Sequence, residues 1–493
     1  MSKKRAPSIP VTQYLIISFF SGFAVLSLEM LGFRFLAPYF GYSTYVWGSL
    51  LGSIMAALSG GYYLGGILAD KKPKGRLAYQ LILYATLYLM GILFFYKSIL
   101  GILASGGIIW GSLAASVFLF GPPMLLLGML SPFLIKIIAQ KDAVGMASGK
   151  VFAISTWGSL TGVFFTSFYL IPEWGSFRTL TFVIILLAII YVSGNCNSWF
   201  KSGGGAAIIA TVMIFPGNQA SSDVVYQTES AYNLIQIKKN TEGYSLHLND
   251  GRWTHSSYKK GFVSTGNYYD FMLLGTLLTP FKDVLILGTG AGTSIRQFLF
   301  FEPGVKIDAV ELDPKVVAAG KQFFELPEVP NLKIFVEDAR PFLKRIEKKY
   351  DVIEMDIFSG GPFVPFYLST KEYFKLISNK LKPKGLLLMN SLRIGNKDDF
   401  SNRLSQTILE EFPSLYKINL NNNVLILATK EKTTLNSVKK ILSENTGSKI
   451  KPIVEYALKN IQEFTSDTKN GIFTDDQAPT ERLVFEMVKD SYN

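Results

Sequence analysis

The chain of 493 residues contains one cysteine, Cys196, and two histidines, His247 and His255. A single cysteine cannot form an internal disulfide, and so few sulfur and imidazole groups provide no set with the spacing of a zinc site. We therefore expect no bound metal and no prosthetic group.

Acidic residues are scarce in the first 200 positions, which hold 13 Lys and Arg but only 4 Asp and Glu. This stretch accounts for +9 of the formal net charge of +12, so the basic pI of 9.3 mainly reflects membrane topology. The rest of the chain holds 36 basic and 33 acidic side chains. This near balance argues against a nucleic-acid partner, which requires a basic face.

Apolar stretches of about 20 residues, the length that crosses a bilayer, fill the first 200 positions. They lie near 11–37, 45–69, 78–96, 103–138, 150–171 and 177–195. We favour six spans with 206–215 at the membrane interface; eight remain possible, since 103–138 is long enough for two helices broken at 121–123. Glycine pairs at four-residue spacing predict close helix packing at Gly48/Gly52, Gly61/Gly65 and Gly158/Gly162.

Basic clusters at 3–5, 71–76 and 136–150 have the pattern of cytoplasmic segments. Because the first basic cluster precedes the first span, an even number of spans returns the chain to the cytoplasm. We therefore expect a multi-pass protein of the cell (inner) membrane with the lipid bilayer as a partner. Residues 1–220 form the predicted transmembrane domain, and the domain that follows is cytoplasmic.

The composition changes near residue 220. Strand patterns at 233–238 and 244–249 predict a small β subdomain over 223–282. From Asp283, apolar runs alternate with helical stretches, which indicates a parallel, doubly wound sheet with ligands at the carboxyl ends of its strands. The predicted strands are 284–287, 306–310, 333–336, 351–355 and 385–390.

Three glycines, Gly288, Gly290 and Gly292, follow the first of these strands. They permit a tight turn and the close approach of a ligand to the backbone. Thr293 stands where G-x-G-x-x-G has its last glycine, so the loop is typical of methyltransferase-like folds. It favours an adenosyl sulfonium compound over a dinucleotide.

Carboxylates end the next strands. Glu311, at the end of the second, is placed to accept both ribose hydroxyls. Asp338, at the end of the third, is placed to accept from an adenine amino group. The glycine loop and these two carboxylates predict a nucleoside cleft, with ordinary surface carboxylates as the alternative.

Asp356 ends the fourth strand and precedes a Gly-Gly-Pro stretch, which predicts a mobile apolar flap. An amine nucleophile must lose a proton before it attacks the carbon beside a sulfonium. Asp356 is placed to orient that amine and accept its proton; the alternative is a capping or turn aspartate.

These motifs resemble the spermidine synthase family, the polyamine aminopropyltransferases, and in particular its membrane-fused branch. The resemblance covers residues 226–395 and extends to 149–162 and 474–481. It implies a multi-pass α-helical membrane domain, a small β subdomain, and an α/β methyltransferase-like (Rossmann-type) catalytic domain over 283–493. The implied reaction moves an aminopropyl group from the co-substrate decarboxylated S-adenosylmethionine to putrescine or a related amine, giving spermidine and methylthioadenosine.

The resemblance assigns roles by position, with Asp356 as the proton acceptor. The co-substrate contacts that it implies are Asn233, Gly288, Gly290, Gly292, Glu311, Asp338, Ala339 and Pro365. The amine contacts that it implies are Tyr269, Asp270, Ala291, Asp356 and Ser359.

Three of these amine-side positions depart from the family pattern: Tyr269 replaces a His, whereas Ala291 and Ser359 each replace an Asp. Each anionic partner that is missing would contribute about 1.5–3 kcal/mol as a charge-assisted bond, which weakens the case for a dication such as putrescine. The candidates that could replace this charge are Asp270, Glu354 and the Asp475–Asp476 pair.

Two alternatives to aminopropyl transfer remain at this stage. The same fold could use intact S-adenosylmethionine to methylate or alkylate another amine or a lipid-borne acceptor. The soluble half could instead bind a nucleoside without turnover, in a transporter or sensor. The amine and the oligomeric state stay open, and a homodimer is compatible with the sequence.

Overall fold

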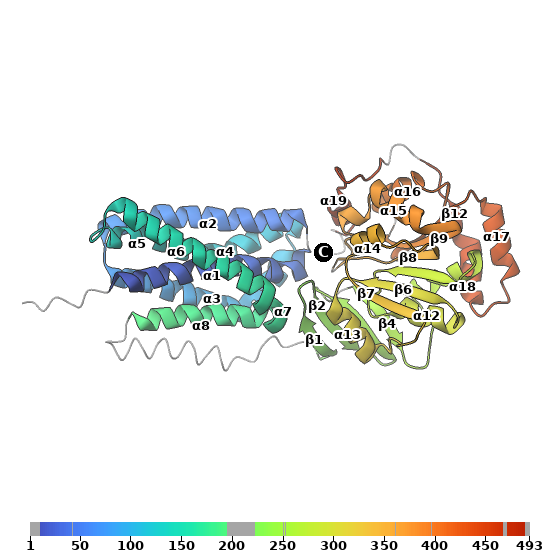
Figure 1. Ribbon diagram of the computed structural model, residues 1–493, viewed down its shortest axis with the longest axis horizontal. Coiled ribbons are helices and arrows are strands. Elements are labelled where there is room, and N and C mark those ends of the chain that lie inside the picture. Colours follow the sequence, from blue (N-terminus) through green and yellow to red (C-terminus); the bar gives the residue numbers. More distant parts are fainter. Residues whose placement is uncertain are drawn as a thin grey trace, which may run out of the picture. The chain divides into compact units, whose positions relative to one another are not determined.

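The computed structural model describes residues 10–194 except 42, and 222–488 except 250, 252, 360, 396 and 467–470. The chain divides into two compact units (Figure 1): Met1–Ala220 with Glu229–Ala231, and Ser221–Thr228 with Tyr232–Asn493. The expected interfacial segment 206–215 lies outside the described residues.

The first unit is built from long apolar helices. Among the described residues, six helical stretches are long and apolar enough to cross a membrane. Their elements are α1 (Val11–Phe40), α2 (Thr44–Lys71), α3 (Gly75–Ala104), η1 (Gly107–Gly111), α4 (Ser112–Gly128), α5 (Leu130–Ile138), α6 (Val144–Phe165), η2 (Thr166–Leu170), α7 (Ile171–Trp174) and α8 (Ser176–Ser193).

The fourth stretch, Gly107–Ile138, comprises η1, α4 and α5 and counts as one candidate span. Pro122 and Pro123 lie inside α4, so the break considered at 121–123 does not occur. Prolines are tolerated within membrane helices because neighbouring groups can satisfy the backbone carbonyls that they release.

Glycines let neighbouring helices of this unit approach each other. A Cβ added at Gly158 would lie 1.9 Å from the carbonyl oxygen of Phe19 on α1, and one at Gly61 would lie 2.3 Å from a carbonyl oxygen on α4. A Cβ at Gly48 or Gly52 would meet no atom of the described residues within 4 Å. The prediction of close packing is therefore wrong for this pair, which faces open space.

The second unit begins with a four-stranded antiparallel sheet in the order β1-β2-β3-β4. Its strands are β1 (Val224–Glu229), β2 (Leu234–Lys239), β3 (Gly243–Leu248) and β4 (Thr254–Lys259). β2 and β3 lie within one residue of the predicted strands. Two short helices, α10 (Tyr269–Met272) and α11 (Gly275–Leu278), lead from this sheet to the next.

An eight-stranded sheet follows in the order β12-β10-β11-β9-β8-β5-β6-β7. Strands β5 to β9 are parallel, as predicted, whereas β10, β11 and β12 extend the sheet in antiparallel fashion. The strands are β5 (Asp283–Leu287), β6 (Lys306–Glu311), β7 (Leu332–Val336), β8 (Tyr350–Met355), β9 (Leu381–Leu392), β10 (Ser414–Asn419), β11 (Asn423–Thr429) and β12 (Ile461–Glu463).

Helices connect these strands, and an apolar core lies between them and the sheet. Because the parallel strands are neighbours, their carboxyl ends meet at one edge. The helices are α12 (Thr293–Phe301), α13 (Pro314–Phe323), α14 (Ala339–Arg345), η3 (Phe366–Leu368), α15 (Lys371–Lys380), α16 (Asp399–Leu409), α17 (Leu435–Glu444), α18 (Lys451–Asn460) and α19 (Thr480–Val488).

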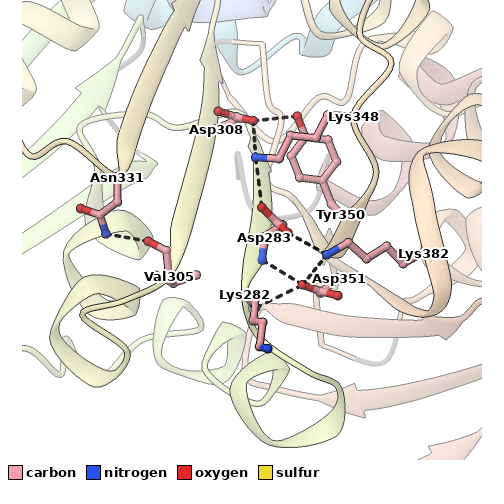
Figure 2. Close-up of polar contacts among 9 residues, drawn as sticks. All are labelled: Lys282, Asp283, Val305, Asp308, Asn331, Lys348, Tyr350, Asp351 and Lys382. Atoms are coloured by element: carbon pink, nitrogen blue, oxygen red, sulfur yellow. Dashed lines mark hydrogen bonds and ion pairs between the residues drawn. The ribbon is translucent and has the colours of Figure 1, made fainter.

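Charged side chains tie together the opposite, amino-terminal edge of the sheet (Figure 2). Lys382 on β9 donates to Asp283 on β5 at 2.7 Å and to Asp351 on β8 at 3.0 Å. Asp351 also accepts the backbone N–H of Asp283 at 2.8 Å. On β6, Asp308 accepts from Lys348 and from the hydroxyl of Tyr350, both at 2.9 Å. These bonds hold four neighbouring strands in register at the edge opposite the glycine loop.

Candidate active site

The glycine loop joins β5 to α12 and bends sharply. Gly288, Gly290 and Gly292 have φ of +83°, +53° and +92°, values that residues with a Cβ rarely adopt. A Cβ at Gly288 would also lie 2.4 Å from the carbonyl oxygen of Asp356. The loop therefore requires glycine and lies directly against the carboxyl end of β8.

Glu311, the last residue of β6, points back to this loop. Its carboxylate accepts the backbone N–H of Gly290 at 2.8 Å and that of Asp313 at 3.1 Å. Desolvation raises the pKa of Glu311 to about 7, although both N–H bonds oppose the rise. A second lone pair on each oxygen stays available for hydroxyl donors, which is the geometry that a ribose requires.

Asn233, just before β2, lies beside the same edge. Its amide donates to Asp313 at 3.1 Å and accepts from Asn249 at 3.0 Å. Asp313 is the N-cap of α13 and accepts from the backbone of Lys315. The four-stranded sheet thus contributes Asn233 to the group around Glu311.

Asp338 follows β7 and is the N-cap of α14, accepting from the backbone N–H of Arg340 at 2.8 Å. Its other oxygen accepts the hydroxyl of Tyr367 at 2.6 Å. Burial and Asp338 together raise the pKa of that Tyr367 hydroxyl. Ala339, the first residue of α14, is buried beneath them. The predicted adenine acceptor is therefore already oriented by two donors.

Asp356 follows β8 and is held by two side chains from elsewhere in the chain. Tyr268 donates its hydroxyl to one carboxylate oxygen at 2.8 Å, and Asn390 on β9 donates its amide to the other at 2.9 Å. Asn390 in turn accepts from Asn423 at 2.9 Å. Desolvation raises the pKa of Asp356 to about 6, against the effect of both donors. Such a carboxylate is ionised near neutrality and is a stronger base than a solvated aspartate.

Tyr269 and Asp270, two predicted amine contacts, have different surroundings. Tyr269 packs against Tyr268 with 4.0 Å between ring centroids and the rings tilted by 34°, and it donates to the carbonyl of Thr254 at 3.3 Å. Asp270 is 4% exposed and accepts five hydrogen bonds. Its donors are Ser264 Oγ, Thr265 N, Thr265 Oγ1, Gly266 N and Gln297 Nε2. Asp270 therefore fixes the loop before α10 and has little remaining capacity for a ligand.

Ala291 and Ser359 occupy positions where the resemblance implies an aspartate. Ala291 is fully buried in an apolar cluster that includes Val316 and Ala319, so its methyl group faces the protein core. Ser359 carries no charge and closes a turn, its backbone N–H donating to the carbonyl of Phe363 at 2.8 Å. Pro365 begins the η3 turn by accepting the N–H of Leu368.

The C-terminal segment contacts the same edge of the sheet. Arg340 forms a fork with Asp475 at 2.9 and 2.6 Å and donates to the carbonyl of Tyr367 at 2.9 Å. Asp475 also accepts the hydroxyl of Thr370 at 2.7 Å. Asp475 is thus committed to structure, and it braces the segment that carries Tyr367.

Four side chains of this site were not identified from the sequence: Tyr268, Arg340, Tyr367 and Asn390. Tyr268 precedes an implied amine contact, and Asn390 is the polar residue that ends the apolar run 386–389 of β9. That polar interruption was the available signal for Asn390. Arg340 and Tyr367 carry no comparable signal, because their roles depend on contacts with distant segments.

Parts of this chain are similar to known proteins. Residues 272–418 match the family model for the spermine/spermidine synthase domain. A probable polyamine aminopropyl transferase of Bifidobacterium longum is 28% identical over 318 residues, covering 61% of this chain and 68% of that protein. A polyamine aminopropyltransferase of Vibrio vulnificus is 26% identical over 223 residues, covering 42% and 71%. The crystal structure of a probable spermidine synthase from Corynebacterium glutamicum superposes with a TM-score of 0.40 at 20% identity, covering 49% of this chain and 91% of that one.

Proposed function

Because this chain belongs to the spermidine synthase family and is an aminopropyltransferase, we propose that it transfers the aminopropyl group of decarboxylated S-adenosylmethionine to putrescine or a closely related amine. The products are spermidine and methylthioadenosine. The observation that best supports this proposal is the placement of Asp356. Its carboxylate accepts hydrogen bonds from two side chains, and its backbone lies against the glycine loop.

The donor is held by its nucleoside part. In this proposal Glu311 accepts the ribose hydroxyls, and Asp338 accepts the adenine amino group. Both carboxylates are already positioned by backbone N–H groups, so little reorganisation is needed on binding. Tyr367 shares Asp338 with the incoming base.

Asp356 then acts on the acceptor. The amine arrives as an ammonium ion, and Asp356 accepts one of its protons. The nitrogen lone pair attacks the aminopropyl carbon bonded to sulfur, and the carbon–sulfur bond breaks. Its electron pair neutralises the sulfonium, so methylthioadenosine leaves as a neutral thioether. Asp356 finally releases the proton to water.

Asp356→Asn tests this assignment. We expect methylthioadenosine formation to fall by about 10²–10⁴-fold, with the donor affinity measured by calorimetry retained. Asp399→Asn, at an exposed position on α16, is the matched control and should keep full activity. If Asp356→Asn turned over at the wild-type rate, the proposed proton acceptor would be wrong.

Analysis of the product separates this proposal from the alternative of methyl or alkyl transfer. Ala291, which replaces the family's aspartate, favours that alternative because it removes an anionic group from the amine side. Transfer from intact S-adenosylmethionine yields S-adenosylhomocysteine, whereas aminopropyl transfer yields methylthioadenosine. A protein that bound either donor and formed neither product would be a nucleoside-binding transporter or sensor.

We also propose that the first unit anchors the enzyme in the cell membrane. Its six apolar helical stretches support this. An even number of spans would return the chain to the membrane face on which the basic segments lie, which we assign to the cytoplasm. Resistance to carbonate extraction tests the membrane anchor. A reporter fused to the C-terminus tests separately whether the second unit lies in the cytoplasm. A reporter signal on the outer side would refute the cytoplasmic assignment while leaving the anchor intact.

A further inference from the structure

Glu354 is an acidic residue in the centre of the large sheet. It lies on β8 two residues before Asp356, and its sheet partners are Ile286 on β5 and Leu388 on β9. Side chains two residues apart on a strand point to the same face. Glu354 is only 1% exposed, a position that a carboxyl group rarely occupies without a partner.

Only half of the Glu354 carboxyl is satisfied. Ser294 on α12 donates its hydroxyl to Oε1 at 2.6 Å. Oε2 is buried and has no hydrogen-bond partner among the described residues. A buried polar atom without a partner is unfavourable, and in native proteins it calls for a specific explanation. A ligand that donates to Oε2 would provide one.

Glu354 lies near Asp356 and Tyr269, two of the residues that the resemblance assigns to the amine. Desolvation, Asp356 and Glu354 together raise the pKa of the Tyr269 hydroxyl, so Tyr269 is close to both carboxyl groups. The neighbouring strands present apolar residues, and α12 presents Ser294. Among the described residues, the titratable groups that interact electrostatically with Glu354 are Asp356, which follows β8, and Tyr269 on α10.

Two of the other acidic candidates, Asp270 and Asp475, are already committed, and Asp476 is exposed to solvent. Asp270 accepts five hydrogen bonds from its own loop and from Gln297. Asp475 forms a fork with Arg340 and accepts from Thr370. Of the candidates described here, only Glu354 combines a free buried oxygen with a position beside Asp356.

We propose that Glu354 binds a cationic nitrogen of the acceptor amine and thereby supplies the negative charge that Ala291 and Ser359 do not carry. This inference rests on the proposed function. Two carboxyl groups, one on β8 and one directly after it, then serve the acceptor: Asp356 takes the proton of the attacking nitrogen, and Glu354 neutralises positive charge beside it. The enzyme would select acceptors that carry two ammonium groups over those that carry one.

Burial raises the pKa of Glu354 to about 8, and the charge of Asp356 adds to the rise. In the empty enzyme the group is therefore mostly protonated near neutral pH. An ammonium ion favours the carboxylate, so binding of the diamine releases the Glu354 proton to water.

The kinetic test uses the full-length enzyme with putrescine as the probe. Glu354→Gln should raise KM for putrescine by about tenfold or more, with the donor affinity unchanged. The ratio of kcat/KM for putrescine to that for n-butylamine should fall by a similar factor. Ser294→Ala removes the partner of Oε1 but keeps the charge, so it is the matched control and should preserve this ratio.

Calorimetry provides an independent readout. Putrescine binding in buffers of different ionisation enthalpy should show proton release in the wild type and none in Glu354→Gln. If Glu354→Gln does not fold, Glu354→Asp keeps the charge and should retain diamine selectivity. An active wild type with unchanged selectivity and proton release in Glu354→Gln would overturn this inference alone. A wild type that forms no methylthioadenosine with any amine would instead overturn the proposed function.

Discussion

Asp356 shows how a single carboxyl group is tuned for its task. Desolvation raises its pKa to about 6, while hydrogen bonds from Asn390 and Tyr268 limit the rise. The group must be ionised to accept a proton, so kcat/KM should fall as the pH drops below about 6. Its two donors favour the carboxylate form and fix the orientation of the group.

Tyr268→Phe removes one of the donors that lower the pKa of Asp356. We expect the acidic limb of the kcat/KM profile to move to higher pH by about half a unit to one unit. Tyr456→Phe, at a tyrosine that donates to the carbonyl of Asn419, should leave the limb in place. A limb that does not move in Tyr268→Phe would show that another group controls it.

Glu354 makes the stability of the empty enzyme depend on pH. Its folded-state pKa of about 8 lies above the ordinary value of 4.5. A carboxyl group whose pKa is higher in the folded than in the unfolded state contributes fully to the free energy of unfolding below pH 4.5. That contribution is lost as the pH rises through about 8. The full-length enzyme in detergent should therefore melt at a lower temperature at about pH 9 than at about pH 6, and Glu354→Gln should reduce that difference. An identical pH dependence in both proteins would contradict the buried, raised pKa.

At the scale of elements, the glycine loop joins β5 to α12 and lies against the backbone of Asp356, the proposed proton acceptor. Gly288→Ala places a Cβ 2.4 Å from the carbonyl oxygen of Asp356 at a φ of +83°, a strain on the order of 1–3 kcal/mol. We expect donor affinity to fall by about tenfold or more. Gly304→Ala, whose Cβ would meet no described atom within 4 Å, is the matched control and should bind the donor normally.

A second feature at this scale is the contact between α14 and the C-terminal segment, which positions Tyr367. Arg340→Ala removes the fork to Asp475 and the bond to Tyr367, so residues 363–370 should become more accessible to protease. We expect the donor KM to rise about threefold to tenfold. Arg340→Lys should restore it only in part, because lysine lacks the planar fork. Arg345→Ala, on the same helix but in an exposed pair with Glu337, should leave both readouts unchanged.

At the scale of the whole molecule, the two edges of the large sheet have separate tasks. The amino-terminal edge is held by Lys382, Asp283 and Asp351, whereas the carboxyl edge carries the loop and the acceptor carboxylates. Lys382→Met removes the ion pair with Asp351 and one of the two ion pairs of Asp283, which keeps Lys348 at 3.3 Å. The loss should cost on the order of 1–3 kcal/mol and lower the melting temperature by a few degrees. The value of kcat should be unchanged. Lys440→Met, in an exposed pair on α17, should alter neither quantity, and a loss of kcat in Lys382→Met would show that the edges are coupled.

Local patterns accounted for much of the fold because they depend on neighbouring residues. The five parallel strands were predicted within a few residues, since a buried strand must be apolar on both faces. The antiparallel extension by β10 to β12 was not predicted, because nothing in those short runs specifies which strand they join. The pair Gly48 and Gly52 shows the same limit: its spacing is suited to helix packing, yet no helix lies against it in the described structure.

The sequence by itself determined the apolar helices, the glycine loop and the carboxyl groups that end successive strands. These features follow from period, spacing and residue type, which the chain carries locally. Only the tertiary structure decided which carboxyl groups are available to a ligand. Asp270 is consumed by its own loop and Gln297, and Asp475 by Arg340 and Thr370. Asp356 is oriented by Tyr268 and Asn390, and one buried oxygen of Glu354 has no partner among the described residues. Availability depends on hydrogen-bond partners brought together by folding, and no local pattern encodes them.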